Sequence, residues 1–211
     1  MEIEKSAISR GIDEIIHFTT NEGLIGILHS EFLLPNARLK EENTLEFIFS
    51  QNSEQRKERD KKWLDFVNFS ITKVNHEFFS YSQQRRRSQT IFWVILSFSI
   101  KILNDDKVVF TTTNNIYPSC TREPGLIGFD KMFSESIVGK FQVNMLRTEH
   151  HLPSWTTCEQ AEVLYPDGCS ISHLLKIYVR NEDNKHSVKG ILAALNKDYD
   201  VVIAPDMFKK I

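Results

Sequence analysis

The sequence has few cysteines, no long apolar run and almost no net charge, and each deficit excludes a class of protein. Its three cysteines form no CxxC pair, which argues against a zinc site or a disulfide framework and favours reduced thiols in the cytosol. No apolar stretch approaches the roughly 20 residues that span a bilayer. The acidic, polar residues 1–5 do not form a secretory signal. We therefore expect a cytoplasmic protein with no membrane partner and no metal.

Charge is low in total but uneven along the chain. The net charge of −2 does not mark a nucleic-acid binder. Basic residues outnumber acidic ones over residues 56–62, a pattern that favours a solvated surface. Residues 85–87 are three consecutive arginines and follow an aromatic stretch at residues 78–81. Because guanidinium groups beside aromatic rings suit an unstacked base and its phosphate, Arg85 and Arg86 are candidate nucleic-acid contacts.

The spacing of apolar residues predicts a single α+β domain over residues 1–211, since no linker or repeat interrupts it. Short apolar or β-branched runs predict strands over residues 12–19, 63–71, 91–98, 108–112, 162–165, 174–179 and 201–204. We expect helices after Asn21, which suits an N-cap, and within residues 126–137 and 185–196. Residues 40–62 suit a loop or a surface helix, and residues 113–125 suit a loop. Helices and strands do not alternate regularly, which argues against a doubly wound sheet.

One carboxylate, that of Glu162, opens an otherwise apolar strand. Val163 and Leu164 follow it and favour a half-buried extended backbone. An ionised carboxylate buried without a partner costs several kcal/mol, so such a residue faces a cleft, a cation or a polar ligand. A glutamate on an edge strand that points to water is the alternative, and this segment alone does not decide between them.

Four short motifs occur in order between residues 10 and 179. They are RGI with HFT over residues 10–19, FSI with Asn75 over 69–75, WVIL and FTTTN within 93–114, and LP, TT and QAEVL within 152–164. Each is unspecific alone, but the ordered set resembles the DarT-type nucleic-acid ADP-ribosyltransferases, which are toxins of toxin–antitoxin and phage-defence modules.

The resemblance implies an ADP-ribosyltransferase fold, in which a split, mainly antiparallel β core with peripheral helices binds NAD. It implies transfer of ADP-ribose from NAD to a base of single-stranded DNA, and a cognate antitoxin protein as partner. The bond to nicotinamide breaks through an oxocarbenium-like ribose, whose charge a nearby carboxylate stabilises. By this resemblance Glu162 is the candidate catalytic carboxylate.

The same resemblance assigns residues to the cofactor. His17 is expected to bond a ribose hydroxyl of NAD, with Phe18 and Thr19 beside it, and Ser70 is expected on the nicotinamide side. Gly26 suits a close approach of the ligand, although simple helix packing explains it equally well.

One position departs from the family pattern. Many members carry an arginine after the second motif, and here Asn75 stands in that neighbourhood, so no arginine is assigned at this position. One of the arginines 85–87 is the alternative source of that cation, although no spacing supports it. We therefore expect Asn75 to act on the nicotinamide side as a candidate catalytic residue. The departure leaves the modified base open.

Residues 147–159 precede the Glu162 strand, and in this fold class the loop there contacts the acceptor. Trp155 offers a stacking surface for a splayed base, or it anchors the loop to the core. Arg147 and His151 are candidate phosphate contacts. Chemistry on a base requires it to be unstacked, which favours a single strand over a duplex.

Three other functions stay open from the sequence: transfer to RNA, transfer to a protein side chain, and a non-catalytic nucleic-acid-binding module that keeps the fold. Transfer of label from NAD to a DNA or RNA oligonucleotide would indicate a nucleic-acid ADP-ribosyltransferase. Label on protein alone would indicate a protein acceptor, and oligonucleotide binding without label transfer would indicate the non-catalytic module.

Overall fold

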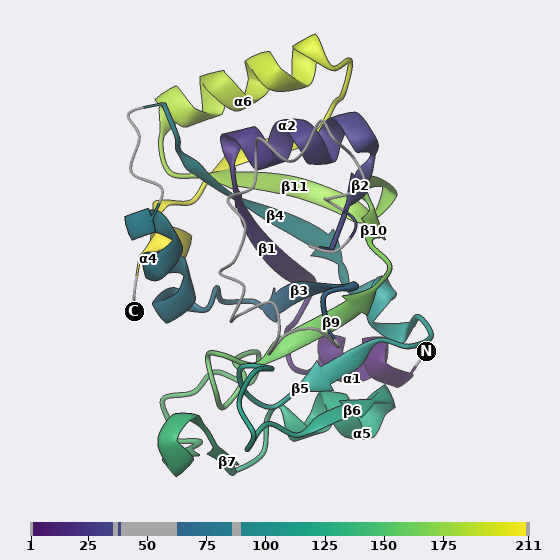
Figure 1. Cartoon of the computed structure of the whole chain (residues 1–211), viewed down its shortest axis with the longest axis vertical. Helices are drawn as coiled ribbons and strands as arrows, with labels where there is room; N and C mark the ends of the chain where they lie inside the picture. The colour runs from purple at the N-terminus through teal and green to yellow at the C-terminus, as the bar shows by residue number, and fades with distance from the viewer. Residues whose placement is uncertain (1, 36–37, 39–62, 86–89, 210–211) are drawn as a thin grey trace.

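A computed structural model describes residues 2–35, 38, 63–85 and 90–209 (Figure 1). Three sequence predictions lie outside these ranges: the loop or helix at residues 40–62, the basic surface at 56–62, and the contact by Arg86. The described residues form a mixed α+β fold around one large sheet, as the sequence predicts.

The central sheet has eight strands in the order β12-β11-β4-β1-β3-β9-β5-β6. Neighbouring strands are antiparallel except for β11 and β12, which are parallel. In this order the strands are β12 (Asp200–Ile203), β11 (Leu174–Val179), β4 (Trp93–Ser99), β1 (Glu14–Thr20), β3 (Phe66–Ile71), β9 (Glu162–Pro166), β5 (Val109–Thr111) and β6 (Arg122–Pro124). Two small two-stranded antiparallel sheets pair β10 (Cys169–Ser170) with β2 (Phe32–Leu33), and β7 (Ser136–Val138) with β8 (Asn144–Leu146).

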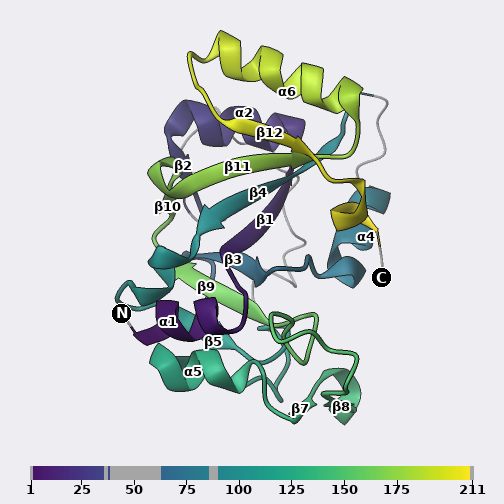
Figure 2. The same cartoon turned by 180° about the vertical axis from the view of Figure 1, so that it is seen from behind.

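Helices cover the two ends of the sheet separately. α2 (Asn21–Ser30) and α6 (Glu182–Ala194) lie against β4 and β11, whereas α1 (Glu2–Ser9) and α5 (Gly125–Lys131) lie together beside β5 and β6 (Figures 1 and 2). α4 (His76–Arg85) stands at one side, near the C-terminus (Figure 2). None of the helices in the described ranges is long and apolar enough to span a bilayer.

Burial patterns explain why these segments form strands. β4 is buried along its middle five residues, as expected of a central strand covered on both faces. β3 instead alternates, with Val67, Phe69 and Ile71 in the core and the side chains of Asn68 and Ser70 on the other face. Polar groups on that second face are therefore available to a ligand.

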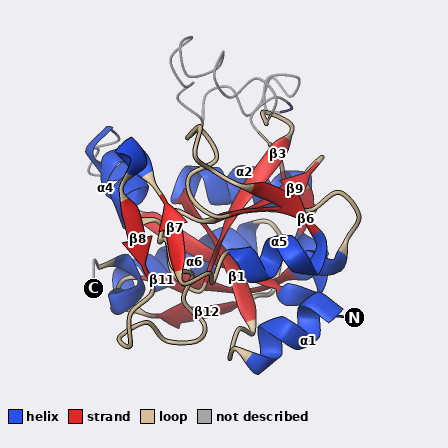
Figure 3. Ribbon diagram, turned by 90° about the horizontal axis from the view of Figure 1, so that it is seen from below, coloured by secondary structure: helices blue, strands red, loops and turns tan. Residues whose placement is uncertain are grey.

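The sheet separates between β1 and β3. β1 pairs with β4 at seven positions but with β3 only at Ile15 and Ile16, so the two strands diverge from His17 onward. This divergence is the split that the resemblance predicts, and it places residues 17–20 beside an opening. In the view from below, α1 and α5 lie on the side of the N-terminus and α4 on the opposite side, near the C-terminus (Figure 3).

The buried carboxylate of Glu14, at the first residue of β1, links this end of the strand to its neighbours by hydrogen bonds. Glu14 accepts hydrogen bonds from Ser97 at 2.6 Å and Tyr178 at 2.7 Å, and its third partner is the ammonium of Lys176 at 3.1 Å. Because these partners come from β4 and β11, the network joins three adjacent strands. A buried carboxylate surrounded by donors is stabilising, whereas an unpaired one is costly.

Several details differ from the sequence predictions. Thr20, not Asn21, caps α2, because the Thr20 hydroxyl accepts from the Gly23 amide. The loop at residues 113–125 ends in β6, and the aromatic stretch at 78–81 belongs to α4, which the sequence analysis did not assign. The three cysteines are free and buried.

Candidate active site

A cavity of about 400 Å³ opens where β1 and β3 diverge. Its walls come from β1, β3, β9, α4 and the loop after β5. Seven of the sequence-predicted site residues line it: His17, Phe18, Thr19, Ser70, Asn75, Arg85 and Glu162. Gly26 does not line the cavity and is buried within α2, where helix packing accounts for it.

Glu162 lies half-buried at the start of β9, and both of its carboxylate oxygens are held by N–H donors. The side-chain amide of Asn68 donates to Oε1 at 2.8 Å, and the backbone amide of Asn115 donates to Oε2 at 2.9 Å. β9 pairs with β3 on one side and β5 on the other, so the edge-strand alternative for Glu162 is wrong. The structure thus places an oriented carboxylate in the cavity wall.

The backbone around Glu162 is fixed from the neighbouring strand. Its amide donates to the Thr111 hydroxyl at 2.9 Å, and that hydroxyl lies 2.9 Å from the carbonyl of Thr113. Thr111 and Thr113 are fully buried. These bonds hold the backbone that carries the Glu162 side chain, while Asn68 and Asn115 orient its carboxylate.

His17 faces the cavity from the first position after the strands diverge. Its Nδ1 lies 2.9 Å from the backbone carbonyl of Asn68, and because a carbonyl only accepts, Nδ1 carries the hydrogen. Enclosure by the cavity walls lowers the pKa of His17 below its ordinary value, and the hydrogen bond to Asn68 only partly opposes this. The neutral imidazole therefore presents Nε2 as a hydrogen-bond acceptor.

Asn68 connects the two main candidates. Its carbonyl orients His17, and its side-chain amide holds Glu162. The sequence analysis missed this residue, although the alternation of β3 would have shown that Asn68 and Ser70 share a face opposite the apolar residues. Asn115 was missed as well, because no periodicity marks a residue in the loop after β5.

Aromatic rings line the side of the cavity nearest α4. Phe18 packs with Phe78 and Trp93 at ring-centroid distances of 5.8 and 5.7 Å, and these residues line the cavity together with Tyr81. The sequence analysis linked the aromatic stretch of α4 only to the neighbouring arginines. Flat apolar walls with a few amides and one carboxylate suit a ligand that has rings and hydroxyls.

Asn75 lines the cavity and also begins α4. Its side-chain oxygen accepts from the Phe78 amide at 3.0 Å, which makes it the N-cap of that helix. The group left for a ligand on this side chain is its NH₂, which donates. Asn75 therefore suits ligand binding, and its capping role gives a purely structural reason for an asparagine here.

The loop before β9 is tied to the start of α4. The Glu159 carboxylate accepts from the His76 amide at 3.0 Å, and the Gln160 side chain donates to Glu77 at 2.6 Å. Nearby, the ammonium of Lys73 lies over the ring of Trp155, and burial lowers the pKa of Lys73 while the Glu159 charge partly opposes this. These contacts fix the direction in which the chain enters β9.

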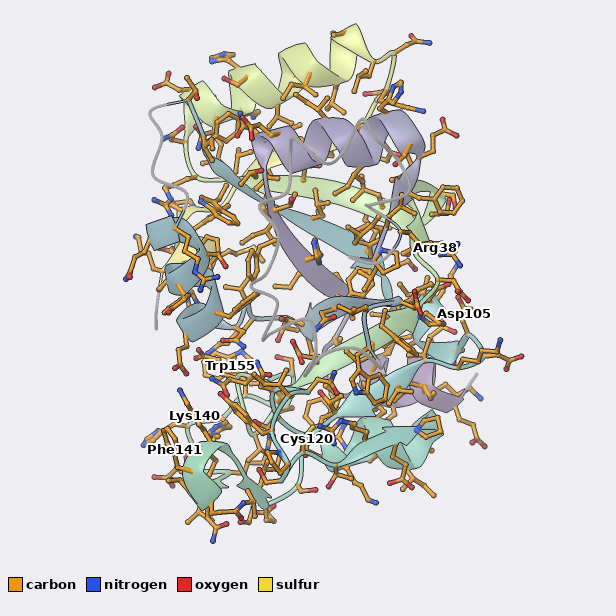
Figure 4. The ribbon with its side chains drawn as sticks, viewed as in Figure 1. Arg38, Asp105, Cys120, Lys140, Phe141 and Trp155 are labelled. Carbon is orange, nitrogen blue, oxygen red and sulfur yellow. The ribbon has the colours of Figure 1, made fainter. Side chains whose placement is uncertain are left out.

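The three predicted acceptor contacts in this loop do not line the cavity. Arg147 donates to the backbone carbonyls of Trp155 at 2.7 Å and Leu152 at 2.9 Å, and the Nδ1 of His151 accepts from the Thr148 amide. Both side chains thus shape the loop. Trp155 is half-buried and lies on the side of the molecule below α4, as do Lys140 and Phe141 (Figure 4).

Arg85 ends α4 with its guanidinium carbon 4.7 Å from the ring centroid of Tyr81. Both residues line the cavity, so the predicted cation beside an aromatic ring is present at its edge. Within the described ranges, no three His, Cys, Asp or Glu side chains are grouped as metal ligands would be.

Comparison with known proteins agrees with this geometry. Residues 16–209 match the family model described as "ssDNA thymidine ADP-ribosyltransferase, DarT". No curated protein sequence matches the chain.

Solved DarT structures share the fold at low sequence identity. Thermus sp. 2.9 DarT in complex with ADP-ribosylated ssDNA superposes with a TM-score of 0.67 at 16% identity, over 94% of this chain and 97% of that one. The same Thermus protein in complex with NAD+ gives a TM-score of 0.64 at 18% identity, over 93% and 98%. Thermosipho africanus DarTG in complex with ADP-ribose gives 0.60 at 12% identity, and this chain spans only 51% of that longer chain.

Proposed function

The chain belongs to the DarT family of ssDNA thymidine ADP-ribosyltransferases, and from this premise we propose that its cavity binds NAD and transfers ADP-ribose to thymine in single-stranded DNA. The observation that carries the proposal is Glu162, whose two carboxylate oxygens are held in the cavity wall by Asn68 and Asn115. The fold shared with the NAD+ complex of the Thermus enzyme supports the same ligand.

Glu162 suits the charge that this reaction develops. The bond between ribose C1″ and the nicotinamide nitrogen breaks, nicotinamide leaves with the bonding electrons, and positive charge builds on the ribose. A fixed carboxylate stabilises that charge without reorganising during the reaction. A new bond then forms between C1″ and a ring nitrogen of thymine, and the proton of that nitrogen passes to Glu162 or to solvent. Atoms and charge balance with no further reactant.

His17 suits the donor's hydroxyls. A neutral imidazole with Nδ1 bonded to Asn68 offers Nε2 to a ribose O–H, whereas a protonated one would present a second donor and add positive charge. The lowered pKa of His17 therefore maintains the form that binds a hydroxyl. The rings of Phe18, Phe78 and Trp93 supply the flat surface that nicotinamide or adenine requires.

The acceptor must reach the cavity as an unstacked base, which favours single-stranded DNA. Tyr81 and Arg85 line the cavity and combine a ring face with a cation, so they suit contacts to this base. Trp155, on the loop outside the cavity, offers a ring beside Lys73 to the rest of the strand. Support comes from the Thermus structure, which contains ADP-ribosylated ssDNA.

A transfer assay tests the proposal. The protein is incubated with NAD labelled on the adenylate phosphate and with single-stranded oligonucleotides that contain thymine or have cytosine in its place. We expect label on the thymine strand alone, little on the duplex or on matched RNA, and none with the variant Glu162→Ala. The matched control Glu123→Gln, whose carboxylate pairs with Lys131 outside the cavity, retains transfer.

Two outcomes of this assay overturn the proposal. Oligonucleotide binding without label transfer would indicate a non-catalytic module, and label on protein alone would indicate another acceptor. Label on RNA in preference to DNA would keep the enzyme class and refute the acceptor.

A toxin role and a protein that neutralises it are part of the same proposal, supported by the family and by the fold shared with the longer DarTG chain. Expression of the wild-type chain should arrest bacterial growth, and expression of Glu162→Ala should not. Growth arrest by both variants would refute toxicity through ADP-ribose transfer.

A further inference from the structure

Arg122 lies on β6, two strands away from Glu162. The register pairs Thr111 of β5 with Arg122 on one side and with Glu162 on the other. Arg122 and Glu162 thus flank the same residue, and Asn115, in the loop of residues 112–121 that connects β5 to β6, is bonded to both of them. Arg122 does not line the cavity.

The guanidinium of Arg122 donates to four acceptors of that loop. Its Nε bonds the side-chain oxygen of Asn115 at 2.8 Å, and its Nη2 bonds the backbone carbonyl of Asn115. Its remaining bonds reach the carbonyls of Cys120 at 2.8 Å and Tyr117 at 3.1 Å. A planar guanidinium has a fixed fork of five N–H donors, so it can hold several carbonyls of one loop at once.

Two of the four bonds end on Asn115, the residue that holds Glu162. Asn115 is 5% exposed, and its backbone amide donates to Glu162 Oε2 at 2.9 Å. Bonds from Arg122 to both the carbonyl and the side chain of Asn115 fix the orientation of this residue and, with it, the direction of its amide. The chain of contacts runs from guanidinium to Asn115 to carboxylate.

We propose that Arg122 is a positioning residue for the transfer reaction, which sets the Glu162 carboxylate through the backbone of Asn115. This inference rests on the proposed function. A guanidinium is needed because an ammonium offers no planar fork to the Asn115 carbonyl and side chain together. Arg122 also places a positive charge 5.9 Å from the ring centroid of Trp63, a residue that lines the cavity.

Kinetics of Arg122→Gln and Arg122→Lys test the inference. With the thymine oligonucleotide we expect kcat of Arg122→Gln to fall about tenfold to a hundredfold, with the KM for NAD changed less than about threefold, because the carboxylate loses its orientation while the rest of the cavity persists. Arg122→Lys should fall by nearly as much although it keeps the charge. Asn115→Ala removes one of the two acceptors and should give a smaller loss in the same direction.

The matched control is Arg10→Gln. Arg10 is also half-buried and pairs with Asp130 at 3.1 Å beside the ring of Phe133, but its contacts join α1 to α5 and do not reach Glu162. This variant should lower the melting temperature and leave kcat unchanged. All rates are measured below the melting temperature of each variant, determined by circular dichroism.

An unchanged kcat in both Arg122 variants would overturn the inference, as would a loss confined to the KM for NAD. If Arg122→Gln does not fold, Arg122→Lys and Asn115→Ala decide by the same criteria. A wild-type chain without transfer activity would refute the proposed function instead, so the two failures are distinguishable.

Discussion

Replacement of Glu162 by glutamine isolates the charge of the carboxylate from its shape. Glutamine has the same size, and its amide oxygen can accept from the Asn115 backbone amide as Oε2 does. The amide nitrogen then faces Asn68, whose side-chain amide can turn over and offer its oxygen instead of its nitrogen. Both hydrogen bonds persist in this arrangement, so the fold and the cavity should change little.

The magnitude follows from the position of the charge. A full ribosyl cation about 4 Å from a carboxylate gains about 4 kcal/mol at the effective dielectric of a protein surface. The transition state carries only part of that charge, so we expect Glu162→Gln to lose about 3 kcal/mol of transition-state stabilisation. At 1.36 kcal/mol per tenfold, the chemical step slows by about a hundredfold.

Single-turnover transfer to the thymine oligonucleotide measures that step, and titration calorimetry measures the Kd for NAD. We expect the rate to fall about a hundredfold and the Kd to change less than about threefold. Glu123→Gln serves as the control because its carboxylate pairs with Lys131 away from the cavity. Wild-type rates in Glu162→Gln would refute the catalytic role, and a loss of NAD affinity with an unchanged rate would reassign Glu162 to binding.

Three further predictions concern pH, stability and the acceptor. Because burial lowers the pKa of His17, the unfolded chain binds a proton at higher pH than the folded chain, so the free energy of unfolding should fall as pH drops below about 6.5. In urea titrations, His17→Gln should show a smaller fall than the wild type. An equal fall in both proteins would contradict the lowered pKa of His17. Glu14→Ala removes the acceptor shared by Ser97 and Tyr178 and should lower the free energy of unfolding by about 1.5–3 kcal/mol while kcat stays constant, and a stability within about 0.5 kcal/mol of wild type would show that the network contributes little. Trp155→Ala should weaken oligonucleotide binding by about 1–3 kcal/mol without changing the Kd for NAD, as measured by fluorescence anisotropy, whereas unchanged binding would make Trp155 an anchor of the loop.

Strong local patterns made the sheet predictable. The continuous apolar run at residues 91–98 predicted a central strand, and β4 lies inside the sheet with both faces covered. The runs at residues 174–179 and 162–165 likewise became β11 and β9. Short pairs such as β2 with β10 carry no such pattern, because their geometry depends on segments that lie far apart in sequence.

The order of the motifs pointed to several side chains that line the cavity, but not to the residues that hold them in place. His17 and Glu162 line the same cavity, as expected. Their link through Asn68 depends on the register of β3 with β9 and on the divergence of β3 from β1, which no single segment encodes. Arg122 could not be predicted for the same reason, because its partners are carbonyl oxygens of one loop, and such contacts produce no sequence motif.

Loop residues were the hardest to assign. Arg147 and His151 were predicted to contact phosphates, and the structure instead shows bonds to backbone groups of their own loop. A sequence lists the donors on a side chain but not the carbonyls that the fold brings near them. Asn75 is similar, because its capping bond to the Phe78 amide becomes visible only once α4 is in place.

A crystal structure of this chain with carba-NAD+, which cannot react at the nicotinamide bond, tests the central claim most directly. We predict the dinucleotide in the cavity between β1 and β3, with the Glu162 carboxylate and His17 Nε2 each at hydrogen-bonding distance, about 2.6–3.2 Å, from hydroxyls of bound ribose. A dinucleotide bound elsewhere, or a Glu162 side chain turned into solvent away from the ribose, would contradict it.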